Sequence, residues 1–430
     1  MSSAGNRKYH IVVWGATGFT GSLCCDYIAA RYTALKKPLK WAIAGRTETK
    51  LIELRSAICL KNKISESAVD VIVADIRNAS SLDAMAAQTK VILSTAGPFA
   101  RIGEPIVDAC VRNGCNYVDI TGEPQFVRKV IDKHHAAATA KNLKIVPCCG
   151  FDCIPVDLGC SVMVNEMKMR DLVPKEVKTT LTKMQGGASG GTISSIATAV
   201  ASSTLRDLRE LMNPYYLLPR SSTGQPMEPS SKATSSAAAD KMWFRYDPVI
   251  GQYCAPFFMQ SIDTRVVNRS NAIGGADSEN WKYGQDFIYS EDMASPNFIV
   301  ALLTTLISHI GMLLMYGNLT RALLLAFLPK PGEGPSKKDR EEGFFFFRSH
   351  GKGLDPKTGI VHSIVGRFNG PNGDGGYKQT SAMVAEAAIC LATDNPSPDV
   401  HGVLTPSTAF GQILIDRLKV SPGITFEIDK

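Results

Sequence analysis

Six short apolar runs alternate with segments of helical periodicity through the first 150 residues of this chain. A short apolar run predicts a strand that is buried on both faces, and strands separated by helical patterns predict a parallel, doubly wound sheet. The runs occupy residues 10–14, 40–44, 69–74, 91–94, 116–119 and 144–147. We therefore expect residues 1–150 to form a Rossmann-type α/β domain.

The pattern beyond residue 150 is more varied and predicts a second, α+β domain over 151–380. A glycine-rich stretch at 185–192 precedes helical spacing over 193–211, and the segments 344–348 and 362–368 are patterned as strands. The glycine-rich stretch offers backbone N–H donors to an anionic or carbonyl group, with a flexible turn as the alternative.

Two further segments complete the chain. Residues 221–239 are rich in Ser, Ala and Pro and predict a surface loop. After residue 380, helical patterns near 381–391 and 410–419 precede a final apolar run at 424–428. We expect this C-terminal segment, 381–430, to pack back on the first domain.

One helix of the second domain is unusually apolar. In residues 298–316 the only ionisable side chain is His309. As a helix this segment would extend about 28 Å, close to the roughly 30 Å hydrocarbon thickness of a bilayer. A turn and a shorter apolar run follow, so 298–328 predicts an apolar hairpin that dips into one leaflet or into a lipid-droplet monolayer. The alternative is a helix buried in the core or in a homodimer interface.

The turn after the first strand contains three regularly spaced glycines. In a dinucleotide-binding turn the first glycine permits the tight bend, the second lets the backbone approach a pyrophosphate, and the third packs helix against strand. The helix that follows offers free N–H groups and a partial positive charge to the phosphates. The predicted loop comprises Gly15, Ala16, Thr17, Gly18, Phe19, Thr20 and Gly21.

The end of the second strand indicates which dinucleotide binds. NAD sites usually place a carboxylate there, on the ribose 2′-hydroxyl, but this chain has Arg46 and then Thr47. A guanidinium suits a 2′-phosphate, which predicts NADP(H), and a solvated surface arginine is the alternative for Arg46. Asp75, at the end of the third strand, is expected either near the adenine or as a helix N-cap.

The nicotinamide is expected at the carboxyl ends of the later strands, beside the loops 94–99, 119–123 and 149–157. Ala96, Gly97 and Pro98 break the chain there and leave room for a cofactor. Glu123 and Asp152 are the candidate proton donors beside the hydride, and a structural cap or turn is the alternative for each.

A second cofactor-like pattern is discounted. Tyr32 and Lys36 have the Tyr-xxx-Lys spacing of short-chain reductases, but they end the first helix, far from the nicotinamide.

Composition narrows the classes of partner and the compartment. A net charge of +7 without a long Lys/Arg block argues against nucleic acid. The 11 cysteines are scattered, and no pair with His nearby has the spacing of a zinc site, so we expect no metal and reduced thiols inside the cell. With the apolar hairpin, this places the protein on the cytoplasmic face of a membrane or lipid droplet, with the mitochondrion as an alternative.

These motifs together resemble the saccharopine dehydrogenase-like oxidoreductases, which include the mycobacterial trans-acting enoyl reductases. The resemblance covers nearly the whole chain and implies a Rossmann domain with a second α+β domain, NADP use, and association with membranes or lipid droplets. It also implies a role in lipid or glycolipid metabolism. The matching segments are 15–21, 44–46, 96–99, 117–123, 150–155, 191–192, 376–377 and 405–406.

Three functional hypotheses follow. The first is an NADP-dependent oxidoreductase that reduces a hydrophobic, lipid-type substrate, with an enoyl group as its target. The second is a membrane or lipid-droplet protein that binds NADP(H) without catalysis. The third is a saccharopine-type amino-acid reductase, which would need Arg or Lys side chains for the substrate carboxylates.

Overall fold

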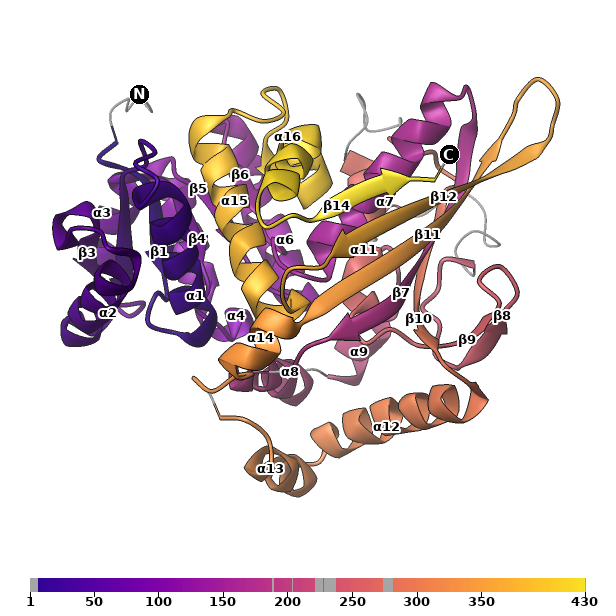
Figure 1. Cartoon of the computed structure of the whole chain (residues 1–430), viewed down its shortest axis with the longest axis horizontal. Coiled ribbons are helices and arrows are strands. Elements are labelled where there is room, and N and C mark those ends of the chain that lie inside the picture. The colour runs from indigo at the N-terminus through magenta and orange to yellow at the C-terminus, as the bar shows by residue number, and fades with distance from the viewer. Residues whose placement is uncertain are drawn as a thin grey trace.

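The computed structural model describes residues 7–187, 189–202, 204–220, 227, 237–273, 281–330 and 332–429. Its elements form two sheets with helices around and between them (Figure 1). Most of the surface loop predicted at 221–239 lies outside the described residues.

The first sheet has seven parallel strands in the order β3-β2-β1-β4-β5-β6-β13. Its strands are β1 (Tyr9–Trp14), β2 (Trp41–Gly45), β3 (Asp70–Val73), β4 (Thr89–Ser94), β5 (Asn116–Asp119), β6 (Lys144–Val146) and β13 (Gly402–Val403). Ile11, Val12 and Val13 are fully buried, as a strand covered on both faces requires. The first six strands follow the Rossmann order, which confirms the predicted doubly wound sheet.

Helices follow the strands of this sheet in alternation. They are α1 (Phe19–Ile28), the π-helical turn η2 (Ala29–Thr33), α2 (Glu48–Asn62), the 3₁₀ turn η3 (Glu66–Ala68), α3 (Ala79–Ala87), α4 (Phe99–Ile102), α5 (Glu104–Asn113) and α6 (Pro124–Ala140). The strand order reverses direction between β1 and β4, so the switch point lies at the carboxyl ends of these two strands.

The second sheet is mixed and also has seven strands, in the order β14-β12-β11-β7-β10-β9-β8. Its strands are β7 (Val173–Gln185), β8 (Arg245–Asp247), β9 (Gln252–Ala255), β10 (Ile288–Ser295), β11 (Phe344–Leu354), β12 (Val361–Gly370) and β14 (Thr425–Ile428). Helix α7 (Cys153–Met169) packs against this sheet, and α11 (Gln260–Ile273) packs against α7. This mixed sheet and its helices confirm the predicted α+β class of the second domain.

The C-terminal segment contributes to both sheets. After the π-helical turn η4 (Gly375–Gln379), helix α15 (Thr380–Thr393) packs against α1, β1, β4 and β5, and α16 (Pro406–Val420) packs against α15 and α7. Strand β14, however, pairs with β12 of the second sheet. The segment 381–430 is therefore divided between the domains, because its last strand completes the second sheet and does not return to the first domain.

The apolar hairpin consists of α12 (Phe298–Tyr316) and α13 (Asn318–Ala326), at the lower edge of the molecule in Figure 1. The Asn297 side chain caps α12 by accepting from Val300 N at 3.0 Å. Only 17% of its apolar stretch is buried, so the alternative of a core helix is wrong, and the homodimer interface stays an alternative. Helix α12 packs against α8 (Gly190–Ser202), β9 and β10. Helix α9 (Leu205–Leu211) is separate from α8, although one helix was predicted over 193–211, and α14 (Lys337–Glu342) follows the hairpin in the chain.

One buried acid joins the C-terminal segment to the first domain. Glu386 of α15 is 1% exposed. Its carboxylate accepts hydrogen bonds from Tyr27 Oη and Tyr32 Oη, each 2.7 Å from Oε1, and pairs with Arg417 Nε at 2.9 Å. The guanidinium of Arg417 also reaches Asp394, at 2.7 Å. Three segments that are far apart in the sequence therefore meet at one charge.

We expect Glu386→Ala to lower the free energy of unfolding by about 3–5 kcal/mol, because it leaves the Arg417 guanidinium and two tyrosine hydroxyls without their shared acceptor. Urea unfolding followed by circular dichroism measures the loss. Asp416→Ala, an exposed acid one position before Arg417, is the matched control and should change stability by less than about 0.5 kcal/mol. Equal effects of the two variants would contradict the role given to Glu386.

Candidate active site

The turn between β1 and α1 is built on close backbone contacts. Gly15 has φ +80°, and a Cβ placed there would lie 2.9 Å from the backbone nitrogen of Ala96. A Cβ at Gly21 would lie 2.2 Å from the carbonyl oxygen of Gly15. Gly15 thus lets the β1 and β4 turns touch, and Gly21 lets α1 approach its own strand, as the motif predicts.

The start of α1 is open to an anion. Its N-cap is Gly18, which supplies no side-chain hydrogen bond, so the first N–H groups of the helix remain without a capping side chain. Thr17 and Gly18 are exposed. Free N–H groups at the positive end of a helix fit the pyrophosphate of a dinucleotide.

A distant segment lies over this loop. The Phe19 ring meets Tyr377 edge-on at 5.3 Å and lies 5.2 Å from the guanidinium carbon of Arg340. A Cβ at Gly334 would lie 2.4 Å from the same ring. The segment 332–340, which follows the apolar hairpin, therefore covers the turn at residues 15–21 and brings the Arg340 guanidinium to it. Sequence reasoning missed Arg340 because no local motif marks a contact across more than 300 residues.

The second-strand end matches a 2′-phosphate site. Arg46 directly follows β2, is exposed, and has no ion pair or hydrogen bond among the described residues. Thr47 is the N-cap of α2. A free guanidinium at this position fits a 2′-phosphate, although that contact stays a prediction.

Asp75 does not cap a helix. The N-cap of α3 is Asn78, which accepts from Ser81 N at 3.2 Å, so the N-cap alternative for Asp75 is wrong. Asp75 instead binds Arg77 through both carboxylate oxygens, at 3.1 and 2.7 Å. The hydrogen bonds from Arg77 lower the pKa of Asp75 to about 2. Asp75 is therefore a fixed anion that positions Arg77 at the carboxyl end of β3.

Glu123 holds the loop on which the nicotinamide is expected to rest. Its two carboxylate oxygens accept from the backbone nitrogens of Phe99, at 2.9 Å, and Ala100, at 2.7 Å. These donors start α4, directly after Ala96, Gly97 and Pro98. Because both oxygens act as acceptors, the geometry favours a positioning role for Glu123 over proton donation.

Asp152 is placed differently, at a strained position on the same edge of the sheet. It is the N-cap residue of α7 with φ +80° and ψ −80°, a conformation that costs a non-glycine residue of the order of 1–3 kcal/mol. Its Oδ1 atom is buried and has no hydrogen-bond partner among the described residues. Burial raises the pKa of Asp152 to about 7.

Two further acids lie behind Asp152, and sequence reasoning missed both. Asp263 of α11 and Glu291 of β10 are 0% and 2% exposed. Burial and the neighbouring carboxyls raise the pKa of Asp263 well above its ordinary value, and burial raises that of Glu291 to about 8. We call Asp152, Asp263 and Glu291 the acid cluster. Its members come from three elements spread over 140 residues, so no spacing reveals it.

Asp119 holds together two loops at the same carboxyl ends of the strands. Its Oδ1 accepts from Thr121 N at 2.9 Å and Cys148 N at 3.0 Å, which ties the β5 turn to the β6 turn. Burial raises the pKa of Asp119 to about 7. The acid therefore shapes the loops that were expected to surround the nicotinamide.

The glycine-rich stretch at 185–192 is a structural turn. The backbone N–H of Ser189 donates to Tyr377 Oη, and that of Gly190 donates to the carbonyl oxygen of Glu333 at 3.0 Å. These donors are taken by the protein, so the structure favours the turn over an anion cradle. The turn brings α8 to the loop where the nicotinamide is expected, and a Cβ at Gly97 of that loop would lie 3.5 Å from Ser195 Oγ.

Two groups of side chains have the geometry of metal ligands, but each contains a lysine. Asp247 and Asp292, with Cys254 beside them, both bind Lys178. Glu104 and Asp108, with His134 beside them, both bind Lys133, at 2.6 and 3.2 Å. An ammonium group among the acids makes these groups ion-pair networks. All eleven cysteines are described, and each is buried and free.

Comparisons with known proteins agree with this geometry. Residues 11–146 match the model of the saccharopine dehydrogenase NADP-binding domain. A Mycobacterium tuberculosis protein provisionally named a trans-acting enoyl reductase is 34% identical, over 98% of this chain and 97% of its own. A trans-acting enoyl reductase of Mycobacterium leprae is 31% identical over 97% of each chain. The Saccharomyces cerevisiae saccharopine dehydrogenase (L-Glu forming) has the same fold, with a TM-score of 0.54 at 12% identity over 98% of this chain and 99% of that one.

The cofactor of the first domain is therefore NADP(H), and its fine contacts can be tested. We expect Arg46→Ala to weaken NADPH binding about tenfold to a hundredfold, because a charge-assisted hydrogen bond contributes about 1.5–3 kcal/mol. NADH, which lacks the 2′-phosphate, should bind the variant as it binds the wild type. Fluorescence titration measures both.

Lys61→Ala is the matched control for Arg46→Ala, because it removes the same charge from the far end of α2, where Lys61 pairs with Asp26. It should leave NADPH affinity unchanged. An equal loss of NADH and NADPH affinity in Arg46→Ala would contradict the 2′-phosphate contact.

Proposed function

Because this chain belongs to the saccharopine dehydrogenase-like oxidoreductases, we propose that this NADP-dependent enzyme reduces an enoyl group of a lipid-type substrate at a membrane or lipid-droplet surface. The observation that carries the proposal is the position of α8. Ser195, in its second turn, lies beside Gly97 of the loop where the nicotinamide is expected, and the apolar side of α8 packs against the exposed hairpin. Relatives with 31–34% identity are named as enoyl reductases, which supports the same reaction class.

The acid cluster supplies the second requirement of such a reduction. Bound NADPH supplies a hydride, and the carbon beside the hydride acceptor must then gain a proton. A carboxyl with a pKa of about 7, such as that of Asp152, still carries a proton in part of the molecules at neutral pH. Asp152 in turn raises the pKa of Asp263 and of Glu291, so ionisation of one member of the cluster disfavours ionisation of the others.

The hairpin supplies the lipid side of the proposal. α12 is long and apolar enough to span a membrane, with a mean hydropathy of 2.2. Ile307 and Leu313 on α12 are 69% and 71% exposed, and Leu319 on α13 is 82% exposed. A contiguous apolar surface of this kind marks a membrane or protein contact. Ala197 and Val200 of α8 pack against Met315 of α12, so α8 links this surface to the loop where the nicotinamide is expected.

The third hypothesis, an amino-acid reductase, is disfavoured by charge. The ionisable side chains that act most strongly on Asp263 are those of Glu291, Asp152, Cys153 and Cys148, which are acids and thiols without a cation among them. A substrate with two or three carboxylates would therefore lack a counter-ion among these groups. An uncharged enoyl group needs none.

We expect Asp152→Asn to lower the rate of enoyl reduction about a hundredfold to ten-thousandfold, because an amide cannot replace a carboxyl as proton donor. Since the raised pKa is about 7, the wild-type rate should be full below pH 7 and fall as the pH rises above it. Oxidation of NADPH with a trans-2-enoyl thioester of medium chain length, followed between pH 5 and pH 9, measures both effects.

The control for Asp152→Asn is Asp171→Asn, at the other end of α7, which also changes an aspartate with positive φ, +57°. It should leave the rate unchanged, and NADPH affinity should stay at the wild-type value in both variants. A wild type that binds NADPH but reduces no enoyl substrate would instead support the second, non-catalytic hypothesis.

Flotation with liposomes tests the membrane contact. We expect the wild type to float with vesicles, and the double variant Ile307→Asp/Leu313→Asp to remain in the dense fraction, because two charges on the exposed face oppose insertion. Leu60→Asp is the matched control, since Leu60 is 84% exposed on α2, away from the hairpin. Flotation of the double variant at the wild-type level would exclude the hairpin as the contact.

A further inference from the structure

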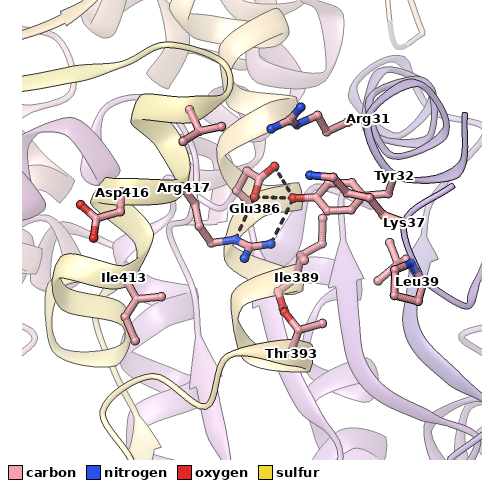
Figure 2. Close-up of a pocket in the computed structure, with 12 residues that line it drawn as sticks. Arg31, Tyr32, Lys37, Leu39, Glu386, Ile389, Thr393, Ile413, Asp416 and Arg417 are labelled. Atoms are coloured by element: carbon pink, nitrogen blue, oxygen red, sulfur yellow. Dashed lines mark hydrogen bonds and ion pairs between the residues drawn. The ribbon is translucent and has the colours of Figure 1, made fainter. Parts of the chain in front are cut away.

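A cavity of about 540 Å³ lies at the amino ends of the strands of the first sheet, opposite the turn at residues 15–21 (Figure 2). It opens between the connection that follows α1 and the helices α15 and α16. Because α1 starts at the carboxyl end of β1 and runs back along the sheet, its last turn, η2, reaches the amino ends of the strands. The cavity is therefore separate from the dinucleotide and acid-cluster sites.

The floor of the cavity is electrically balanced. Glu386 and Arg417 pair there at 2.9 Å, and Tyr32 Oη bonds both, at 2.7 Å to Glu386 and 3.0 Å to Arg417 (Figure 2). The remaining acid of the lining, Asp416, accepts from Gln412 at 2.9 Å and lies on the opposite wall from Arg31. This network leaves no excess negative charge at the floor.

The wall next to Tyr32 holds two uncommitted cations. Arg31 has no ion pair among the described residues, and its buried Nε atom has no hydrogen-bond partner. Lys37 also pairs with no acid there, and its ammonium group lies 5.4 Å from the centre of the Tyr32 ring. A buried guanidinium N–H without an acceptor is destabilising, and an anion bound here would accept its hydrogen bond.

The rest of the lining is apolar. Leu39 and Ile389 line the interior, and Ile413 and Val420 on α16 are 37% and 72% exposed at the rim. The volume falls within the range of ordinary small-molecule sites, about 300–1,000 Å³. Arg31 and Tyr32 belong to a π-helical turn, an irregularity that is frequent at functional sites.

We propose that this cavity binds an amphiphilic anion, a free carboxylate with a medium-length alkyl chain. The carboxylate contacts Arg31 and Lys37, and the alkyl chain lies along Leu39, Ile389 and Ile413. Two cations beside an apolar wall suit this class of ligand better than a polar anion, which would leave the wall exposed to water, or an uncharged lipid, which would leave the cations unpaired. The site is independent of the enoyl-reductase proposal.

Isothermal titration of the full-length protein with decanoate, below its micelle-forming concentration, tests the site. We expect one decanoate per chain. Arg31→Ala and Lys37→Ala should each weaken binding about tenfold or more, since a charge-assisted contact contributes about 1.5 kcal/mol or more. Ile413→Asp, an exposed substitution, should weaken it as well. Lys36→Asn is the matched control, because Lys36 lies beside Lys37 but outside the cavity, and it should bind decanoate as the wild type does.

Other results would overturn the proposal. Decanol binding as tightly as decanoate would show that the cations do not select the ligand. Decanoate affinity unchanged in both Arg31→Ala and Lys37→Ala would place the ligand elsewhere, including the reaction site. A wild type that sediments as a dimer which Arg31→Ala dissociates would make this face an interface between two copies. Absence of decanoate binding, with NADPH binding intact to report a folded protein, would end the proposal.

Discussion

The carboxylate of Glu386 is the constraint on which the arrangement of the first domain depends. A charge that is 1% exposed is tolerated only when it is paired and hydrogen-bonded. Its partners come from the end of α1 and from α16, so these elements can pack against α15 in one register. Helix α1 begins at the turn of residues 15–21. The Glu386 contact at the amino ends of the strands therefore fixes the helix whose start forms the expected pyrophosphate site at their carboxyl ends.

Backbone approach is the second constraint, and it acts at the opposite end of α1. The contact of Gly15 with Ala96 joins the turns after β1 and β4, where the strand order reverses. Glu123 then fixes the loop after Ala96 through two backbone hydrogen bonds. The loop is therefore held from both sides before any cofactor binds, which is the preorganisation that hydride transfer requires.

Features that depend on neighbouring residues could be predicted from the sequence. Residues that only the fold brings together could not. The glycine turn, Arg46 and the buried strands follow from short-range geometry, and the structure places them as predicted. Arg340, Asp263 and Glu291 reach the site across more than 100 residues, so no spacing marks them. Asp75 shows an intermediate case, because Asn78, three positions later, competes for the same cap and wins it.

The protonation of the acid cluster determines which reaction this site suits. Burying three ionised carboxyls together would cost far more than a domain's stability, so the pKa values rise and protons stay bound. Near neutral pH, a site with Glu291 at a pKa of about 8 and Asp152 at about 7 therefore holds protons rather than accepting them. Such a site suits a reaction that adds a hydride and a proton to a neutral double bond, and its three acids offer no counter-ion to an anionic substrate. The strained backbone of Asp152 places this half-buried acid at the carboxyl ends of the strands, where the nicotinamide is expected.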